Sequence, residues 1–324
     1  MKLTPRKAAI AGAPLRWCGD RLIVREDGNG DPVFWLVDLR GKRQPFPKQT
    51  SPHACDDRRI LLDVAGKQAG GVWSWKIASW DLKTRLTPFA TCTPDDKLGH
   101  LEIAGERIIG TATERGRHSI VELANNGTRV REVGIGTEVP FRFVTANDLA
   151  VWFYITGKGG VVDLERGTHR PLVGGAVRIG RRHDKGIRDV ALANGHVLAT
   201  FGTQTARVWK LATKKLVRGP WERESVDGAC WLGDRVCWWS RSTFASAQLS
   251  GQVDRRGALP GRVTPLGDGA HVVCFSDERT LEIWTLARRV ARFRASSAIR
   301  GFAASPRYLA VGLDTQRTIV LERS

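Results

Sequence analysis

Histidine and cysteine are the side chains of this sequence best suited to metal binding or acid–base chemistry. The seven histidines are His53, His100, His118, His169, His183, His196 and His271. None of them stands in an HxH, HExxH or HxxxH pattern, the spacings that place two histidines on one metal ion. The six cysteines include no CxxC pair. The sequence therefore predicts no metal centre and no cofactor, although it leaves open a metal site assembled from distant segments.

Motifs for nucleophilic or phosphate chemistry are equally scarce. The chain has no Gly-x-Ser-x-Gly elbow, no phosphate-binding P-loop and no CxxCH haem attachment site. The glycine-rich run 157–160 is too short for a P-loop and stands between two strand-like segments rather than before a helix. We predict no catalytic residue, and hence a protein that is not an enzyme.

The cysteines and the N-terminus indicate a cellular location. Most of the cysteines stand in apolar, strand-like segments, so all six are predicted to be reduced core residues of a cytoplasmic protein; they are Cys18, Cys55, Cys92, Cys230, Cys237 and Cys274. The first residues carry positive charge but no apolar run of signal-peptide length. No stretch approaches the roughly 18 apolar residues that a membrane span needs. We expect no membrane insertion.

Basic residues dominate the charge of the chain. The formal net charge is +18 and the sequence pI is about 10.4. Such an excess favours an acidic partner, whether nucleic acid, an anionic membrane surface or an acidic protein. Arg outnumbers Lys, which is typical of a GC-rich bacterial genome, and Arg scattered over many exposed strands would give the same total. The charge alone does not separate these interpretations.

A repeated pattern of short apolar runs must position these residues. In each repeat a turn rich in Gly, Asp or Asn leads into an apolar run, and a second apolar run then ends in a characteristic triplet. The middle residue of the triplet recurs roughly every 40 residues, which is the length of one propeller blade. The middle residues are Asp38, Asp81, Glu122, Asp163, Lys210, Gln248, Thr285 and Glu322. No long window has a helical period. We predict one all-β propeller spanning residues 1–324, with eight four-stranded blades and seven as the alternative.

Several segments resemble the WD40 family. Trp80-Asp81 matches the Trp-Asp dipeptide of that family, His183 stands where the family has the His of its Gly-His pair, and Trp209 matches the Trp. Residues 299–312 resemble a typical unit of first and second strands. The resemblance covers nearly the whole chain and implies a propeller that acts as a protein-interaction scaffold. It also implies that an N-terminal strand, within residues 3–10, completes the last blade, whose fourth strand is missing.

Tryptophan and basic loop residues are the candidate contacts with a partner. Trp80, Trp209 and Trp284 share one register and are predicted to pack between blades. Strand alternation puts Trp238 and Trp239 on opposite faces of one strand. At least one Trp of that pair, and one of Trp73 and Trp75, must leave its own blade's core, either to pack between blades or to serve as an aromatic anchor for a partner. Loops after the second strands and between blades open on one face, where binding residues concentrate. The partner-binding candidates on that face are Arg178, Arg181, Arg182, Lys185, Arg188, Arg115, Arg117, Lys158, Arg241, Arg279 and Arg317. Acidic neighbours such as Asp277 and Glu278 could instead leave this face merely solvated.

Three functions follow in order of preference. The first is a non-catalytic scaffold or regulatory subunit that binds a protein partner through the basic face, with the net charge favouring an acidic partner. The second is a propeller that binds nucleic acid through the same face, with a steep dependence on salt. The third is an enzyme that uses the central channel.

The strand-like segment 288–294, rich in Arg, is predicted to be an outermost strand whose charges protect an exposed edge.

Overall fold

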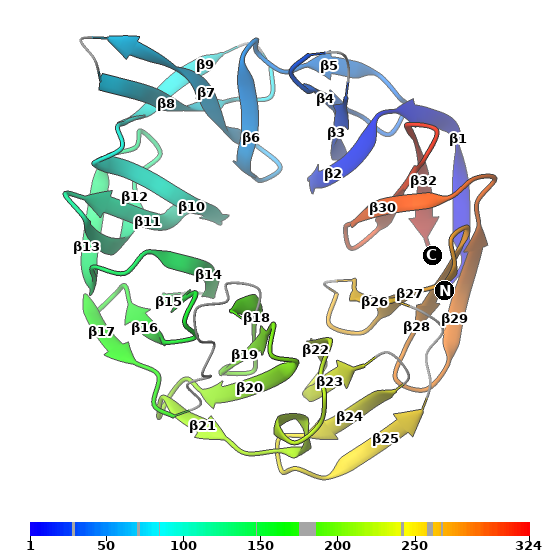
Figure 1. Ribbon diagram of the computed structural model, residues 1–324. Coiled ribbons are helices and arrows are strands. Elements are labelled where there is room, and N and C mark those ends of the chain that lie inside the picture. Colours follow the sequence, from blue (N-terminus) through cyan, green and yellow to red (C-terminus); the bar gives the residue numbers. More distant parts are fainter. Residues whose placement is uncertain are drawn as a thin grey trace.

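The chain folds into a ring of eight blades. The computed structural model describes residues 1–27, 30–69, 72–83, 85–146, 148–174, 186–240, 243–257, 262–266 and 268–324. Within these residues the strands form eight antiparallel sheets of four strands each, arranged as propeller blades around one axis (Figure 1). The first strand of each blade faces the axis and the fourth faces the outside. The predicted eight-bladed propeller is confirmed against the seven-bladed alternative.

The first four blades run in chain order from the first strand to the fourth. Blade 1 contains β2 (Ala13–Cys18), β3 (Arg21–Glu26), β4 (Val33–Val37) and β5 (Arg43–Pro45). Blade 2 contains β6 (Thr50–Cys55), β7 (Ile60–Ala69), β8 (Val72–Trp80) and β9 (Leu86–Cys92). Blade 3 contains β10 (Asp96–Ala104), β11 (Arg107–Glu114), β12 (Arg117–Leu123) and β13 (Arg129–Gly136). Blade 4 contains β14 (Pro140–Ala146), β15 (Leu149–Tyr154), β16 (Gly159–Asp163) and β17 (Thr168–Pro171).

The last four blades follow the same order, except that the N-terminal strand ends the series. Blade 5 contains β18 (Ile187–Ala193), β19 (His196–Phe201), β20 (Thr205–Lys210) and β21 (Lys215–Val217), followed by the short 3-10 helix η2 (Pro220–Glu222). Blade 6 contains β22 (Gly228–Leu232), β23 (Arg235–Trp239), β24 (Phe244–Gln248) and β25 (Val253–Gly257). Blade 7 contains β26 (Arg262–Pro265), β27 (Val272–Asp277), β28 (Thr280–Trp284) and β29 (Arg289–Arg294). Blade 8 contains β30 (Ile299–Ala304), β31 (Tyr308–Leu313), β32 (Arg317–Arg323) and β1 (Leu3–Ala11).

The core lies between neighbouring blades. Second strands such as β3 are buried on both faces, and Leu22, Ile23 and Val24 are fully covered, because another blade packs on each side. This explains why the second strands are continuous apolar runs rather than alternating ones. Trp80 and Trp209, each at or near the end of a third strand, are buried between blades as predicted. All the triplets that mark the repeat lie at or just after the ends of third strands.

The other predicted tryptophans lie in different environments, some between blades and one exposed. Trp238 and Trp239 point to opposite faces of β23, one toward blade 5 and the other toward blade 7. Trp284 is partly buried and packs between blades 6 and 7 as predicted, and its Nε1 donates a hydrogen bond to Glu282. Trp75 packs against the core between blades 2 and 3, whereas Trp73 is exposed. Trp73 is therefore the tryptophan of this hairpin that leaves the core.

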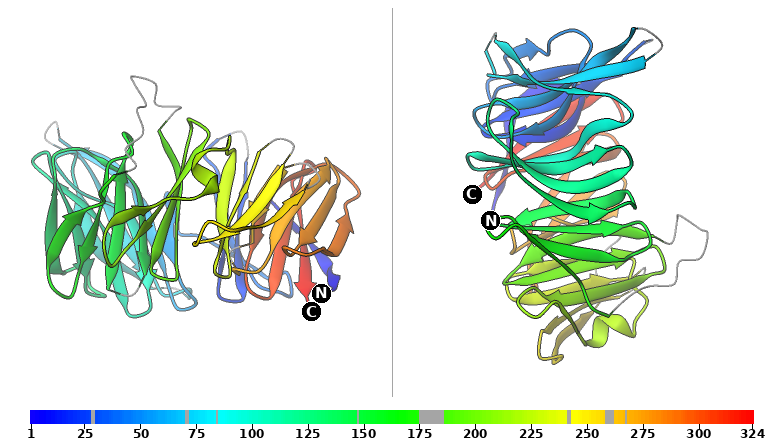
Figure 2. Two further views of the ribbon diagram at one scale, coloured as in Figure 1. Left: turned by 90° about the horizontal axis from the view of Figure 1, so that it is seen from below. Right: turned by 90° about the vertical axis from the view of Figure 1, so that its left-hand side faces the viewer.

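The N-terminal strand closes the ring. β1 pairs antiparallel with β32, and the backbone N–H of Lys2 donates a hydrogen bond of 2.7 Å to the carbonyl of Ser324. Where the chain passes from β1 to blade 1, the buried hydroxyl of Thr318 donates a hydrogen bond of 2.6 Å to the carbonyl of Gly12. Ring closure by residues 3–10 is confirmed. Both termini lie on one face of the ring (Figure 2).

The cysteine prediction is wrong for one pair. Cys18 and Cys55, the last residues of β2 and β6, form a disulfide with their Cα atoms 5.7 Å apart. First strands of adjacent blades end side by side, so residues 37 positions apart in the sequence come within bonding distance. The other four cysteines are buried, and burial raises the pKa of Cys274 to about 12. No helix in the described ranges is long and apolar enough to cross a membrane.

Candidate functional site

The two faces of the ring carry different connections. The antiparallel order of each blade puts the turns between second and third strands, and the connections between blades, on one face, which we call the loop face. The turns between first and second strands and between third and fourth strands lie on the opposite face. The strand order requires both termini to lie on this opposite face (Figure 2).

The described basic candidates lie on the loop face but do not form one patch. Arg115 and Arg117 belong to the turn of blade 3, and Lys158 precedes the third strand of blade 4. Arg279 and Arg317 occupy the corresponding positions in blades 7 and 8, on the other side of the ring (Figure 1). Arg188 is the second residue of β18 and lies on the inner wall. Four candidates between residues 178 and 185, together with Arg241, lie outside the described residues, and they are Arg178, Arg181, Arg182, Lys185 and Arg241.

A recurrent backbone irregularity marks the inner wall of the ring. Six first strands shift register with their second strand: β14, β18 and β30 at their second residue, and β2, β6 and β10 nearer their middle. A bulge leaves a residue unpaired and re-aims its side chain. One unpaired residue from each of these strands belongs to a set that we call the bulge ring: Leu15, His53, His100, Phe141, Arg188 and Arg300. In β10 the neighbouring residue Leu101 is unpaired as well.

Two members of the bulge ring are exposed apolar side chains. Leu15 is 40% exposed and Phe141 is 37% exposed. The guanidinium of Arg142 lies 4.6 Å from the ring centroid of Phe141, and its Nε donates a hydrogen bond of 2.8 Å to the carbonyl of Arg188. Blades 4 and 5 are thus joined at the ring by a stacked arginine, which keeps Phe141 in place and half open to solvent.

A polar cavity of about 830 Å³ lies on the inner wall of blades 1–4. Its lining includes Arg16, His53, His100, Glu102 and Phe143. The Nε2 of His53 accepts the backbone N–H of Leu101 at 3.1 Å, so its proton is on Nδ1, which donates to Asp63 at 3.0 Å. The ring of His53 is therefore fixed by partners from its own blade and from blade 3.

His100 has the most unusual backbone of the cavity. Its φ of 45° lies in the left-handed region, and it is the one non-glycine residue within a described strand that has a positive φ. Such a conformation costs energy and is kept only where the surroundings impose it. Burial lowers the pKa of His100 below the usual range of histidine, and the positive charge of Arg142 acts in the same direction. A neutral imidazole that can donate or accept a hydrogen bond is therefore presented to the cavity.

Two carboxylates accompany these bases. Oε2 of Glu102 accepts hydrogen bonds from the backbone N–H of Thr145 at 3.1 Å and from its hydroxyl at 2.7 Å. Burial raises the pKa of Glu102, an effect that Thr145 and the charge of Arg16 oppose. Burial also raises the pKa of Asp189, which follows Arg188 in β18. The inner wall therefore carries hydrogen-bond donors and acceptors, and both basic and acidic side chains, on the first strands of neighbouring blades.

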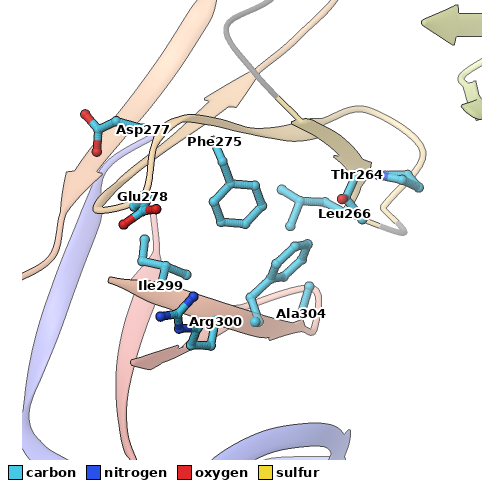
Figure 3. A pocket seen from close by; sticks show the side chains of 11 residues that line it. Thr264, Leu266, Phe275, Asp277, Glu278, Ile299, Arg300 and Ala304 are labelled. Carbon is cyan, nitrogen blue, oxygen red and sulfur yellow. The ribbon is translucent and has the colours of Figure 1, made fainter. Parts of the chain in front are cut away.

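An apolar cavity of about 600 Å³ lies between blades 7 and 8 (Figure 3). Phe275, Leu266 and Ile299 point into it, and the rings of Phe275 and Phe302 have centroids 5.8 Å apart. Arg300 of the bulge ring belongs to its lining. The strands that line this cavity lie across the axis from β6 and β10, which line the polar cavity (Figure 1). The inner wall thus has a second recess, one that suits an apolar side chain.

The bulge ring was not predicted from the sequence, except for Arg188. One signal was available, since Pro14, Pro52 and Pro140 directly precede Leu15, His53 and Phe141. Proline lacks a backbone donor and is confined to strand starts, edges and bulges. Within the described residues no group of three or more His, Cys, Asp or Glu side chains is placed to hold a metal ion.

Comparison with known proteins supports the fold. No known sequence family matches the chain, and no curated protein matches it. Solved structures do match. BamB from Moraxella catarrhalis superposes with a TM-score of 0.62 at 13% identity, covering 99% of this chain and 100% of that one. The C-terminal WD40 domain of Sif2 gives 0.60 at 13% identity, covering 98% and 99%.

A third similar chain comes from a structure of the mitotic checkpoint complex. It has a TM-score of 0.54 and 11% identity, over 82% of this chain and 84% of that one. These similarities are at the level of architecture, because only 11–13% of the residues are identical. This protein is an eight-bladed β-propeller whose fold is similar to those of BamB and of WD40 domains.

Proposed function

We propose that this protein is a non-catalytic scaffold that binds a partner protein on its inner wall. The bulge ring carries the proposal, because six blades repeat the same irregularity on their first strands, the strands that face the axis. Propellers are fold platforms whose function depends on the site they carry.

The composition of this site suits recognition of a polypeptide. Aromatic and Arg side chains are enriched at the centres of protein interfaces. Phe141 and Arg142 form such a pair on blade 4, and Leu15 adds exposed apolar area on blade 1. The polar cavity offers charged and hydrogen-bonding groups, and the apolar cavity accepts an apolar side chain. A partner segment that enters the ring could therefore place different side chains in the two recesses.

The test is affinity capture of partners followed by mass spectrometry. The variant Phe141→Asp/Arg188→Glu changes two exposed residues of the bulge ring, and Arg40→Glu/Arg166→Glu changes two exposed turn residues of the opposite face as a control. We expect the control to retain the partner of the unchanged protein and the bulge-ring variant to lose it. Affinity for the isolated partner should fall at least about tenfold, because interface hot spots contribute more than 1 kcal/mol each.

Three results would contradict this function. Partner loss in the opposite-face control but not in the bulge-ring variant would move the site to the other face. Equal retention by both variants would remove the bulge ring from consideration. Capture that nuclease treatment abolishes, with steep loss at high salt, would favour the nucleic-acid-binding alternative.

A cytoplasmic location remains a prediction. The buried thiols of Cys92, Cys230 and Cys274 agree with it. The disulfide between Cys18 and Cys55 opposes it, because disulfides persist mainly in oxidising compartments. Thiol trapping in intact cells, followed by fractionation, measures both properties together.

A further inference from the structure

The fourth strands of the blades leave one edge unpaired, and most of them carry a feature that blocks further pairing. Proline removes a donor in β5, β9, β17 and β1, glycine and acidic residues interrupt β13 and β25, and β21 is only three residues long. Such features are the usual protection against edge-to-edge association. β29 is the exception among the described fourth strands, because its six residues, Arg289–Arg294, include no Pro, Gly, Asp or Glu.

The backbone groups that β29 turns outward can be assigned from its register. Ala295 donates its N–H to the carbonyl of Arg279 at 2.8 Å, which makes this a hydrogen-bonded pair. Pairs alternate along an antiparallel ladder, and the register is continuous from Ala291 to Arg294. Arg292 and Arg294, which oppose Glu282 and Thr280, are thus in non-hydrogen-bonded pairs. Their N–H and C=O groups point away from β28, toward the outside of the ring.

The charge of this edge is strongly one-sided. Arg288, Arg289, Arg292 and Arg294 are exposed, and Glu282 is the acidic side chain within salt-bridge distance, 3.0 Å from Arg289 and 3.6 Å from Arg292. The Glu282 side chain is only 5% exposed, so its charge is largely covered. Arg294 also acts electrostatically on Asp277. Four guanidinium groups therefore line an edge whose acidic neighbours are fewer and partly buried.

We propose that the outer edge of β29 accepts an acidic, extended segment of another protein as a fifth strand of blade 7. Strand addition supplies affinity through backbone hydrogen bonds and specificity through side chains that alternate along the strand. Basic or apolar strands are disfavoured opposite these arginines, whereas Glu or Asp side chains pair with them. The arginines thus exclude most strands and select acidic ones. This surface lies on the outer wall and does not depend on the function proposed for the bulge ring.

The probe is a synthetic, fluorescently labelled peptide that alternates Glu and Thr, titrated with the full chain at low ionic strength. Arg292→Ala removes one guanidinium, and Arg292→Pro removes the same guanidinium together with the outward N–H. We expect the proline variant to bind at least about tenfold more weakly than the alanine variant, because it loses a backbone hydrogen bond and distorts the edge. Arg166→Ala, at a turn of the opposite face, is the matched control and should bind as the unchanged protein does.

Backbone pairing and simple charge attraction give different results. A peptide of the same sequence with N-methyl groups at alternate residues keeps every carboxylate but cannot complete the ladder, and it should not bind. Equal affinity of both peptides, or of Arg292→Pro and Arg292→Ala, would overturn the proposal in favour of a generic polyanion surface. If an oligonucleotide also binds, and Arg292→Ala and Arg294→Ala weaken its binding as much as they weaken peptide binding, the edge is again a generic polyanion surface. If the peptide shows no saturable binding to the unchanged protein, the strand-addition proposal is refuted. Unchanged circular dichroism and melting of both variants confirm that the edge, rather than the fold, has been altered.

Discussion

The first and fourth strands of each blade both have one edge without a paired strand, on the inner wall and on the outer wall respectively. Different features block further strand pairing at these two edges. Six of the first strands carry a bulge, whereas the fourth strands rely on proline, glycine, shortness or charge. A bulge blocks regular pairing and also re-aims a side chain, but a proline only removes a donor. Protection on the inner wall therefore creates a possible recognition site, and protection on most of the outer wall does not.

The third strand of blade 8 shows what happens to an edge that has no such protection. β32 has a largely buried middle section, and β1 covers it. β29, by contrast, stands uncovered as a fourth strand with charged residues. The difference teaches that an edge can stay open when its side chains are charged, and must be paired when they are apolar.

Deletion of residues 1–10 is expected to have the largest effect, because it uncovers the edge of β32 that β1 protects. It turns β32 into an unprotected apolar edge and removes the β1–β32 ladder that closes the ring. We expect the melting temperature to fall by more than about 5 °C, because a whole strand ladder is lost and each kcal/mol shifts the melting temperature by roughly 1–2 °C in a chain of this length. Scanning calorimetry measures the change. Cooperative melting at an unchanged temperature would show that β1 is dispensable for closure.

Thr318→Val tests one contact of the closure. The substitution keeps the shape of the side chain but leaves the carbonyl of Gly12 without its buried donor. The expected loss in the free energy of unfolding is about 1–3 kcal/mol, the usual cost of an unsatisfied buried polar group. Thr213→Val, at an exposed turn, is the control and should change little. Equal effects of both substitutions in urea titrations would contradict a special role for this hydrogen bond.

Glu102→Gln tests whether the carboxylate of Glu102 on the inner wall destabilises the folded protein. The folded state raises the pKa of Glu102, so the folded protein holds that proton more tightly than the unfolded chain does. Its carboxylate therefore costs stability, and the cost grows as the pH rises from below the unfolded pKa to above the folded one. The free energy of unfolding of the variant, minus that of the unchanged protein, should increase between about pH 4 and pH 7 by roughly 1 kcal/mol or less. A difference that is flat or falls with pH would show that the carboxylate is not destabilised.

Arg292→Pro is expected to have the smallest effect on stability. An outward N–H makes no bond within the blade, so its loss should change the free energy of unfolding by less than about 1 kcal/mol compared with Arg292→Ala. Ala310→Pro, within the second strand β31, should cost about 3 kcal/mol or more because it breaks a paired ladder. Similar losses in β29 and β31 would mean that the N–H of Arg292 points inward.

Some of this protein could be predicted from the order of its residues. The eight triplets around Asp38 and its equivalents, the apolar second runs and the missing fourth strand of the last blade led to an eight-bladed ring closed by residues 3–10. These features are local and periodic, and the same short-range rules of strand and turn formation act in every blade. The contact types of Trp80, Trp209 and the Trp238-Trp239 pair followed from strand alternation for the same reason.

The rest depended on which distant residues the closed ring brings together. The Cys18–Cys55 bond joins two strand ends in adjacent blades, and no local pattern indicates that they meet. The bulge ring depends on register between strands, which a run of residues does not reveal apart from the prolines before Leu15, His53 and Phe141. The open edge of β29 likewise became visible only once its neighbour and its outward-facing N–H groups were known. Periodicity along the chain determined the architecture, whereas register and the contact between blades decided which side chains face a partner.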